Sequence, residues 1–96
     1  MNKIAFSDLI GKTILIGISY YTSDNEFIEQ KQYFGTVIES NESRILIKLS
    51  NGEDFVLPPD LSSVEKAPRG KYTLRSTGET VVNPDYLTTW NVNRQG

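Results

Sequence analysis

The chain has 96 residues, neither cysteine nor histidine, and ten basic against twelve acidic side chains, for a net charge of −2. This length predicts one domain, and balanced charge with 38% hydrophobic residues predicts that it folds. Without cysteine, disulfides and thiolate metal sites are excluded. Without histidine, the commonest general base and metal ligand is missing. We therefore expect no cofactor, no metal and no enzyme activity.

The sequence also predicts a cytoplasmic location. The first residues lack the apolar stretch of a signal peptide. The longest apolar run, residues 14–16, ends at Gly17 and is far shorter than the ~20 residues that span a bilayer. We expect a soluble protein that does not enter a membrane.

The first half of the chain predicts a helical turn followed by strands. The turn covers residues 7–11, with Ser7 as its cap and Gly11 at its left-handed end. Gly35 predicts a bend in a long second strand, and Asn51-Gly52 predicts the tight turn of a hairpin. The strands are expected at residues 13–20, 27–40, 44–50 and 53–57.

The second half is more interrupted. Pro58 and Pro59 end the fourth strand because neither can donate to a ladder. Asp60 is expected to cap a short turn over residues 60–63. The pattern then predicts an irregular stretch at 64–70, strands at 71–75, 79–83 and 86–92, and a tail at 93–96.

Short strands separated by regular turn signals predict an all-β fold. We expect a small barrel of about five to seven antiparallel strands with a short N-terminal helical turn, because closure removes exposed edges. The single domain, residues 1–96, would consist of a core at 7–57, an irregular connection at 58–70, C-terminal strands at 71–92 and a tail at 93–96.

Two motifs in this core resemble the Sm-like proteins. Leu9-Ile10-Gly11-Lys12, at the end of a helical turn, resembles the opening of that family. Tyr33-x-Gly35-x-Val37 is similar to its bent second strand, and residues 44–47 fall where it has a third. The resemblance covers residues 7–57 and implies a barrel of the Src-homology-3-like type. The whole chain also resembles small standalone bacterial proteins.

The resemblance does not extend to the family's RNA site. Sm-like proteins resemble one another in having an Asp and an Asn in the loop before the third strand. These two residues help to read RNA bases. Ser40 and Arg44 occupy the corresponding positions here. We therefore carry over the barrel and not the RNA-binding residues.

Without histidine or cysteine, catalysis would rest on carboxylates, lysine or hydroxyl groups. Glu53, Asp54 and Asp60 flank the bend at Pro58-Pro59. Charged side chains are normally exposed and solvated, so we expect Glu53 in a hairpin, Asp54 in solvent and Asp60 at a cap. A carboxylate-based enzyme is a distant alternative.

A basic stretch supports binding to single-stranded RNA or DNA as the alternative function. Lys71 and Arg75 are expected on one strand face, and Tyr72 or Tyr86 could stack on bases. The slightly acidic chain argues against this function, because nucleic-acid modules are usually basic. The candidate residues are Lys66, Arg69, Lys71 and Arg75.

The aromatic residues favour binding to another protein or to a second copy of the chain. Neighbouring strand residues point to opposite faces, so one of Tyr20 and Tyr21 must lie outside the barrel or under another element. The same holds for Tyr33 and Phe34. We expect a non-enzymatic interaction module, with an immunity, regulatory or self-associating role. Its interface candidates are Tyr86, Trp90, Tyr21 and Tyr33.

Overall fold

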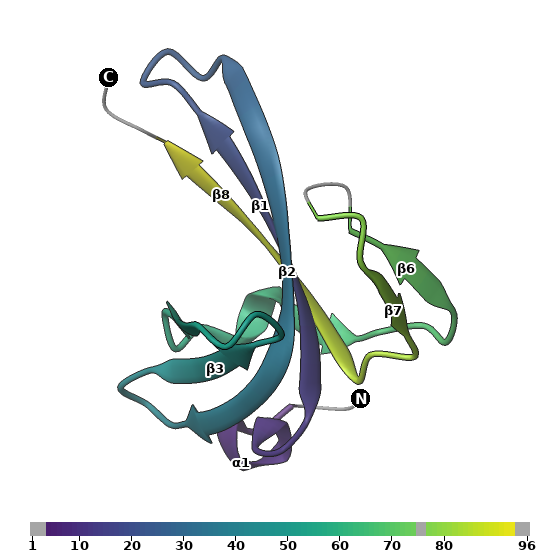
Figure 1. The fold of residues 1–96 in the computed structure, drawn as a ribbon. Coiled ribbons are helices and arrows are strands. Elements are labelled where there is room, and N and C mark those ends of the chain that lie inside the picture. The colour runs from purple at the N-terminus through teal and green to yellow at the C-terminus, as the bar shows by residue number, and fades with distance from the viewer. Residues whose placement is uncertain (1–3, 75–76, 94–96) are drawn as a thin grey trace.

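A computed structural model describes residues 4–74 and 77–93 and shows a twisted sheet with a separate hairpin on one side (Figure 1). The chain begins with α1 (Phe6–Leu9), and a 3-10 helix, η1 (Leu61–Ser63), precedes the fifth strand. The described residues form eight strands: β1 (Thr13–Tyr21), β2 (Phe27–Ser40), β3 (Ile45–Leu49), β4 (Asp54–Leu57), β5 (Val64–Lys66), β6 (Lys71–Thr73), β7 (Thr80–Val82) and β8 (Tyr86–Asn93).

The prediction of a mostly β fold with one short helix is confirmed, but the closed barrel is wrong. The main sheet has the strand order β4-β3-β2-β1-β8-β5, and β6 pairs only with β7. Its outer strands, β4 and β5, do not pair with each other, so the sheet is open. Each is only three or four residues long.

The prediction that all strands are antiparallel is also wrong. β8 lies beside β1 in parallel, with Ile14 opposite Tyr86 and Tyr21 opposite Asn93. The hairpin β6–β7 returns the chain to the end of the sheet where β1 begins. β8 therefore starts at the same end as β1 and runs in the same direction.

The local turns follow the prediction with small shifts. Gly11 ends the helical turn with a φ of +80°, in the left-handed region that glycine adopts without strain. Ser7 is not the cap. The helix begins at Phe6, Ala5 is the N-cap, and the Asp8 carboxylate accepts a hydrogen bond from the Ala5 N–H at 2.9 Å.

The segment expected to be irregular, residues 64–70, contains β5. Val64 pairs with Thr88 and Lys66 pairs with Tyr86, so β8 organises a stretch with little strand signal of its own. At the other end, Asn93 is the last residue of β8 and not the first of a tail. Residues 94–96 lie outside the described part.

β1 supplies two hydrophobic cores, one on each face of the sheet. Ile14, Ile16 and Ile18 are buried in the larger core, which α1, η1 and the curled strands β2–β4 enclose. Leu15 points the other way and packs with Leu74 and Val81 beneath the β6–β7 hairpin. A strand covered on both faces buries consecutive residues, which explains why Leu15 is buried although alternation predicted a half-buried strand.

β2 curves strongly through the centre of the molecule (Figure 1). It pairs with β1 over most of its length but with β3 only from Gly35 to Ser40. β8 likewise pairs with β5 only from Tyr86 to Thr88. Three strand segments therefore project together beyond the rest of the sheet. We call them the ribbon: residues 17–21 of β1, 27–33 of β2 and 89–93 of β8.

Candidate protein-interaction site

The register of the ribbon decides which face each aromatic candidate occupies. Tyr33 lies opposite Ile16 and Trp90 lies opposite Ile18, so both share the face of the larger core. Tyr20 is on the same face and packs against that core. Tyr21 points to the other face. The prediction that Tyr20 and Tyr21 diverge is confirmed.

Tyr33 and Phe34 diverge in the same way. Tyr33 packs against the larger core, whereas Phe34 packs against the smaller core beneath the β6–β7 hairpin. Tyr33 also contacts Phe55 of β4, with ring centroids 5.0 Å apart and an angle of 30° between the rings. Both rings are half-buried, so they form an aromatic rim where the larger core meets solvent.

Tyr86 is buried in the larger core of the single chain. Its side chain is 8% exposed within the larger core. Burial raises the pKa of the Tyr86 hydroxyl above its usual range, and the carboxylates of Asp8 and Asp85 raise it further. The period-two pattern identified the face of Tyr86 correctly, but it could not show that this end of β8 is covered.

Trp90 is half-buried and packs against the larger core from the ribbon. Its indole nitrogen is buried, and no hydrogen-bond acceptor reaches it among the described residues. A buried donor without a partner reduces stability. Trp90 is thus partly structural, while its position on the ribbon places it next to exposed side chains such as Val92, which is 38% exposed.

Phe27 is the most exposed large apolar side chain among the described residues, at 61%. It lies at the start of β2, where its ring meets the edge of Tyr21 at a centroid distance of 5.8 Å. The register shifts beside it, which leaves Ile28 as an extra residue that is 41% exposed. The sequence analysis missed Phe27, although a large apolar residue directly after a polar turn was a usable signal.

An open groove of about 300 Å³ lies between β2, the β3–β4 turn and the loop after β6. Tyr33, Phe34 and Leu74 supply apolar walls. Among the described residues that line this groove, Glu79 carries a charge. The Glu79 carboxylate accepts a hydrogen bond from the Ser50 hydroxyl at 3.0 Å, which ties the β3–β4 turn to the β6–β7 hairpin.

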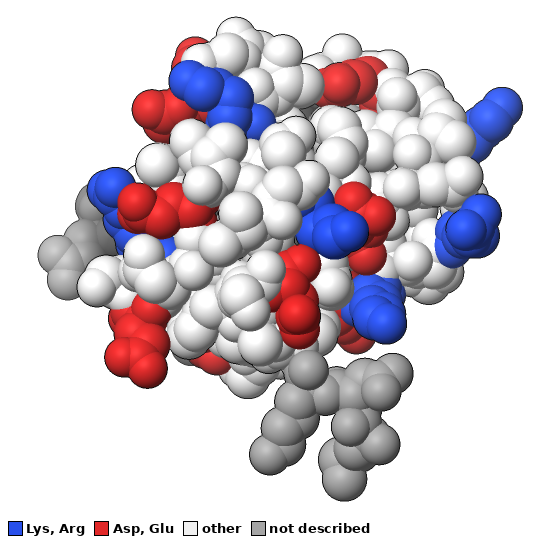
Figure 2. Space-filling view, turned by 90° about the horizontal axis from the view of Figure 1, so that it is seen from below, with Lys and Arg blue, Asp and Glu red and all other residues white. Residues whose placement is uncertain are grey.

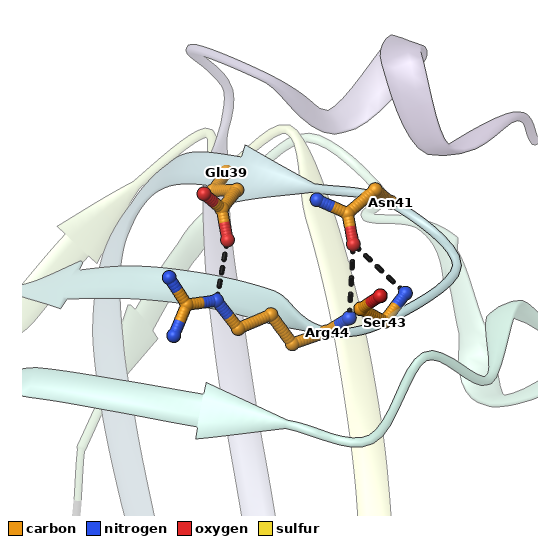
Figure 3. Close-up of polar contacts among 4 residues, drawn as sticks. All are labelled: Glu39, Asn41, Ser43 and Arg44. Atoms are coloured by element: carbon orange, nitrogen blue, oxygen red, sulfur yellow. Dashed lines mark hydrogen bonds and ion pairs between the residues drawn. The ribbon is translucent and has the colours of Figure 1, made fainter.

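Ser40 and Arg44, the positions that correspond to the RNA-binding residues of Sm-like proteins, flank the turn between β2 and β3 (Figure 3). Asn41 accepts hydrogen bonds from the backbone N–H groups of Ser43 at 2.8 Å and Arg44 at 3.1 Å. The Arg44 guanidinium donates to the Glu39 carboxylate, which lowers the pKa of Glu39 and raises that of Arg44. Ser40 is buried. Arg44 is therefore paired with Glu39 on the surface, while the Ser40 hydroxyl is buried with no hydrogen-bond partner among the described residues.

The basic candidates are placed on different elements. Lys66 ends β5 in the main sheet, Arg69 lies in the following loop and Lys71 begins β6; all three are exposed. Arg75 lies outside the described residues. On the face shown in Figure 2, Lys and Arg groups are scattered among Asp and Glu groups without forming a continuous basic surface.

The tyrosines proposed for base stacking have structural roles. Tyr72 packs against the smaller core, and its hydroxyl donates to the carbonyl oxygen of Pro68 at 2.6 Å. Tyr86 is buried, as described above. Tyr72, next to Lys71, is half-buried.

The carboxylates near the prolines are engaged locally. Asp54 forms an ion pair with Lys48 at 2.8 Å, and Asp60 accepts a hydrogen bond from the Ser62 N–H at 2.9 Å, as its predicted capping role requires. Hydrogen bonds from Ser62 lower the pKa of Asp60. Within residues 4–74 and 77–93, no acidic cluster could hold a metal ion, and no helix is long and apolar enough to cross a membrane.

Comparison with protein-family models, curated proteins and solved structures finds no match to this chain. Its function must therefore be argued from the surfaces described above.

Proposed function

We propose that the protein is a non-enzymatic interaction module that binds another protein chain through the ribbon. The observation that supports this most directly is the exposure of large apolar side chains on the part of the sheet that extends beyond β3, β4 and β5. Phe27, Ile28 and Val92 are 61%, 41% and 38% exposed there. Phe27 and Tyr21 contact each other on one face of the ribbon, whereas Val92 lies opposite Tyr20 on the other face. Grouped apolar surface of this kind is typical of interaction sites.

The surroundings of these side chains support the same function. Half-buried aromatic residues lie along the ribbon and its base, including Tyr21, Tyr33 and Trp90. Aromatic residue types are enriched at protein interfaces. Each is anchored by packing, so little conformational entropy would be lost when a partner binds. The ribbon thus combines rigid aromatic side chains with exposed aliphatic ones.

We also propose that the protein acts in the cytoplasm as a relative of the Sm-like proteins, in an immunity or regulatory role. The element order α1, β1 to β4 and the curved β2 that includes Tyr33, Gly35 and Val37 support this relationship. The kinship would concern only the scaffold, because Ser40 is buried and Arg44 is paired with Glu39.

Site-specific photo-crosslinking tests the proposed surface. A benzophenone amino acid is introduced at position 27, at position 92 or, as a control, at position 82. Val82 is a suitable control because it is 58% exposed but belongs to β7, away from the ribbon. We expect discrete protein adducts from positions 27 and 92 in a lysate of the source organism, identified by mass spectrometry, and none from position 82. Equal labelling from all three positions, or none from the ribbon, would contradict the proposal.

A further inference from the structure

The outer edge of β8 is an open strand edge over residues 89–93, the segment called here the β8 edge. The Ala67 N–H donates to the carbonyl oxygen of Asp85 at 3.2 Å, so this carbonyl points toward β5, while the Asp85 N–H, which precedes the strand, donates to the Thr13 hydroxyl. Alternate residues of a strand turn their N–H and C=O groups the same way. Thr89, Asn91 and Asn93 therefore point theirs away from β1, past the end of β5.

Open edges invite pairing with another strand, and proteins usually protect them with charges, prolines, bulges or short length. The outer strands of the main sheet have such protection. β4 has four residues, begins with Asp54 and is followed by two prolines. β5 has three residues, of which Glu65 and Lys66 are charged.

The projecting part of β2 is protected as well. Its register with β1 shifts at Ile28, and Glu29 and Lys31 follow. The β8 edge differs from all of these. Residues 89–93 read Thr-Trp-Asn-Val-Asn, without charge or proline, and their register with β1 is unbroken.

We infer that the β8 edge pairs with the β8 edge of a second copy of this chain, antiparallel about a twofold axis at Asn91. This inference rests on the proposed function and names the partner. Asn91 would lie opposite Asn91 of the second copy, and Thr89 opposite Asn93. These are the residues whose backbone groups point outward, so they can exchange N–H···O=C bonds across the axis.

Side chains on both faces of this pairing are complementary. Trp90 of one copy would lie opposite Val92 of the other, twice by symmetry. An aromatic residue opposite a β-branched one is a favourable cross-strand pair, and Val92 is 38% exposed in the single chain. The other face brings together Thr89, Asn91 and Asn93, which are polar and uncharged. No charge within residues 89–93 opposes another, which favours a second copy over an unrelated charged strand.

The contact would be small. Two strands of five residues bury less than the roughly 1,000 Å² of a stable interface, so we expect a concentration-dependent dimer with a dissociation constant that is roughly micromolar or weaker.

Sedimentation velocity of the full chain from about 1 µM to about 1 mM tests this dimer. Asn91→Pro removes only an N–H that points away from β1, which an edge strand tolerates. Asn91→Ser keeps that N–H and is the matched control. We expect the parent and Asn91→Ser to dimerise and Asn91→Pro to remain monomeric with a similar melting temperature. Dimerisation unchanged by Asn91→Pro, or no dimer in any variant, would overturn the inference.

A second variant covers the case in which Asn91→Pro does not fold. Asn91→Lys keeps the N–H but places two positive charges opposite each other at the axis. We expect it to weaken the dimer at low salt and to recover partly at high salt. A dimer insensitive to this charge would overturn the inference. A monomeric parent whose position 92 crosslinks a different protein would also overturn it, while leaving the proposed function standing.

Discussion

Thr13 and Asp85 are joined by three hydrogen bonds, donated in both directions, although they lie 72 residues apart in the chain. The Asp85 carboxylate accepts from the Thr13 N–H at 2.9 Å and from its hydroxyl at 3.0 Å. The Asp85 N–H in turn donates to the Thr13 hydroxyl oxygen at 3.0 Å. These bonds join the starts of β1 and β8, and thereby fix the parallel pairing that distinguishes this sheet.

Asp85→Ala should therefore destabilise the protein. Loss of a side chain that satisfies backbone donors, as a helix cap does, typically lowers the free energy of unfolding by about 1–2 kcal/mol. Urea denaturation followed by tryptophan fluorescence measures the change. Asp24→Ala is the control, because Asp24 is exposed in the β1–β2 turn and only its backbone N–H is bonded there, to the Thr22 hydroxyl. Equal effects of the two variants would contradict the role of the Thr13–Asp85 pair.

The same pair predicts how stability depends on pH. The Thr13 N–H lowers the pKa of Asp85 below its ordinary value of 3.8; partial burial opposes this, while the Thr13 hydroxyl and Lys12 add to it. Because the folded-state pKa lies below the unfolded-state pKa, the stabilisation is fully present above the unfolded value and is lost as the pH falls through the folded value. The stability difference between the parent and Asp85→Asn should narrow as the pH falls from about 5 to about 2. A difference that stays constant over this range would show that Asp85 ionisation does not contribute.

Adding a side chain at Gly35 should destabilise the protein through a steric clash. A Cβ at this position would lie 2.3 Å from the carbonyl oxygen of Lys48 and 2.9 Å from the Cα of Leu49, both backbone atoms of β3. Gly35→Ala should cost about 2–4 kcal/mol and Gly35→Val more, because β3 must move. Gly17→Ala is the matched control in the neighbouring strand, since its Cβ would only touch Thr89 at 3.7 Å. Melting temperatures of the variants measure the effect, and a Gly35→Val protein as stable as Gly17→Ala would contradict it.

Two substitutions of Trp90 should distinguish its structural role from a role in association. Trp90→Phe keeps a ring in the larger core and removes the buried indole N–H that lacks an acceptor, so its stability should change by less than about 1.5 kcal/mol. Trp90→Ala should cost about 2–3 kcal/mol through lost packing. We expect the Phe variant to fold but to associate more weakly in sedimentation. If Ala unfolds the protein and Phe leaves association unchanged, Trp90 is only a core residue.

Nucleic-acid binding through the basic stretch should be weak. Lys66, Arg69 and Lys71 lie on separate elements of a slightly acidic protein, so few phosphate contacts can form together. Fluorescence anisotropy with a labelled single-stranded oligonucleotide should give a dissociation constant that is roughly micromolar or weaker at physiological salt. Tight binding that weakens steeply with salt, and that is lost when Lys71 and Arg75 become Glu, would instead support the alternative function.

Local features of the fold could be predicted from the sequence because they depend on neighbouring residues. Alternating side chains identified β1 and β3, and Asn51-Gly52 marked the β3–β4 hairpin. Gly35 predicted a bend in β2, which curves strongly, although the register with β3 shifts between Val37 and Glu39. Gly52 has the expected positive φ of +93°. Each of these signals arises within a few residues, where backbone sterics decide the conformation.

Long-range pairings could not be predicted in this way. Nothing in the pattern of residues 86–92 says that β8 joins β1 in parallel, or that Val64–Lys66 becomes a strand by pairing with β8. The same limit applies to the candidate site. Alternation correctly separated Tyr20 from Tyr21, but the burial of Tyr86 and the exposure of Phe27 depend on which strands end beside them.

The parallel β1–β8 pair also constrains the order in which the molecule is assembled. Strands β1 to β4 are joined in sequence by short turns, so each strand can pair with the preceding strand as soon as it has been synthesised. β8 must close a loop of about 72 residues before it can dock, and that closure is entropically expensive and slow. Until synthesis has reached Asn93, one side of β1 stays unoccupied, with Ile14, Ile16 and Ile18 only partly covered. Docking of β8 is therefore the step that pairs the second side of β1 and allows β5 to join the sheet.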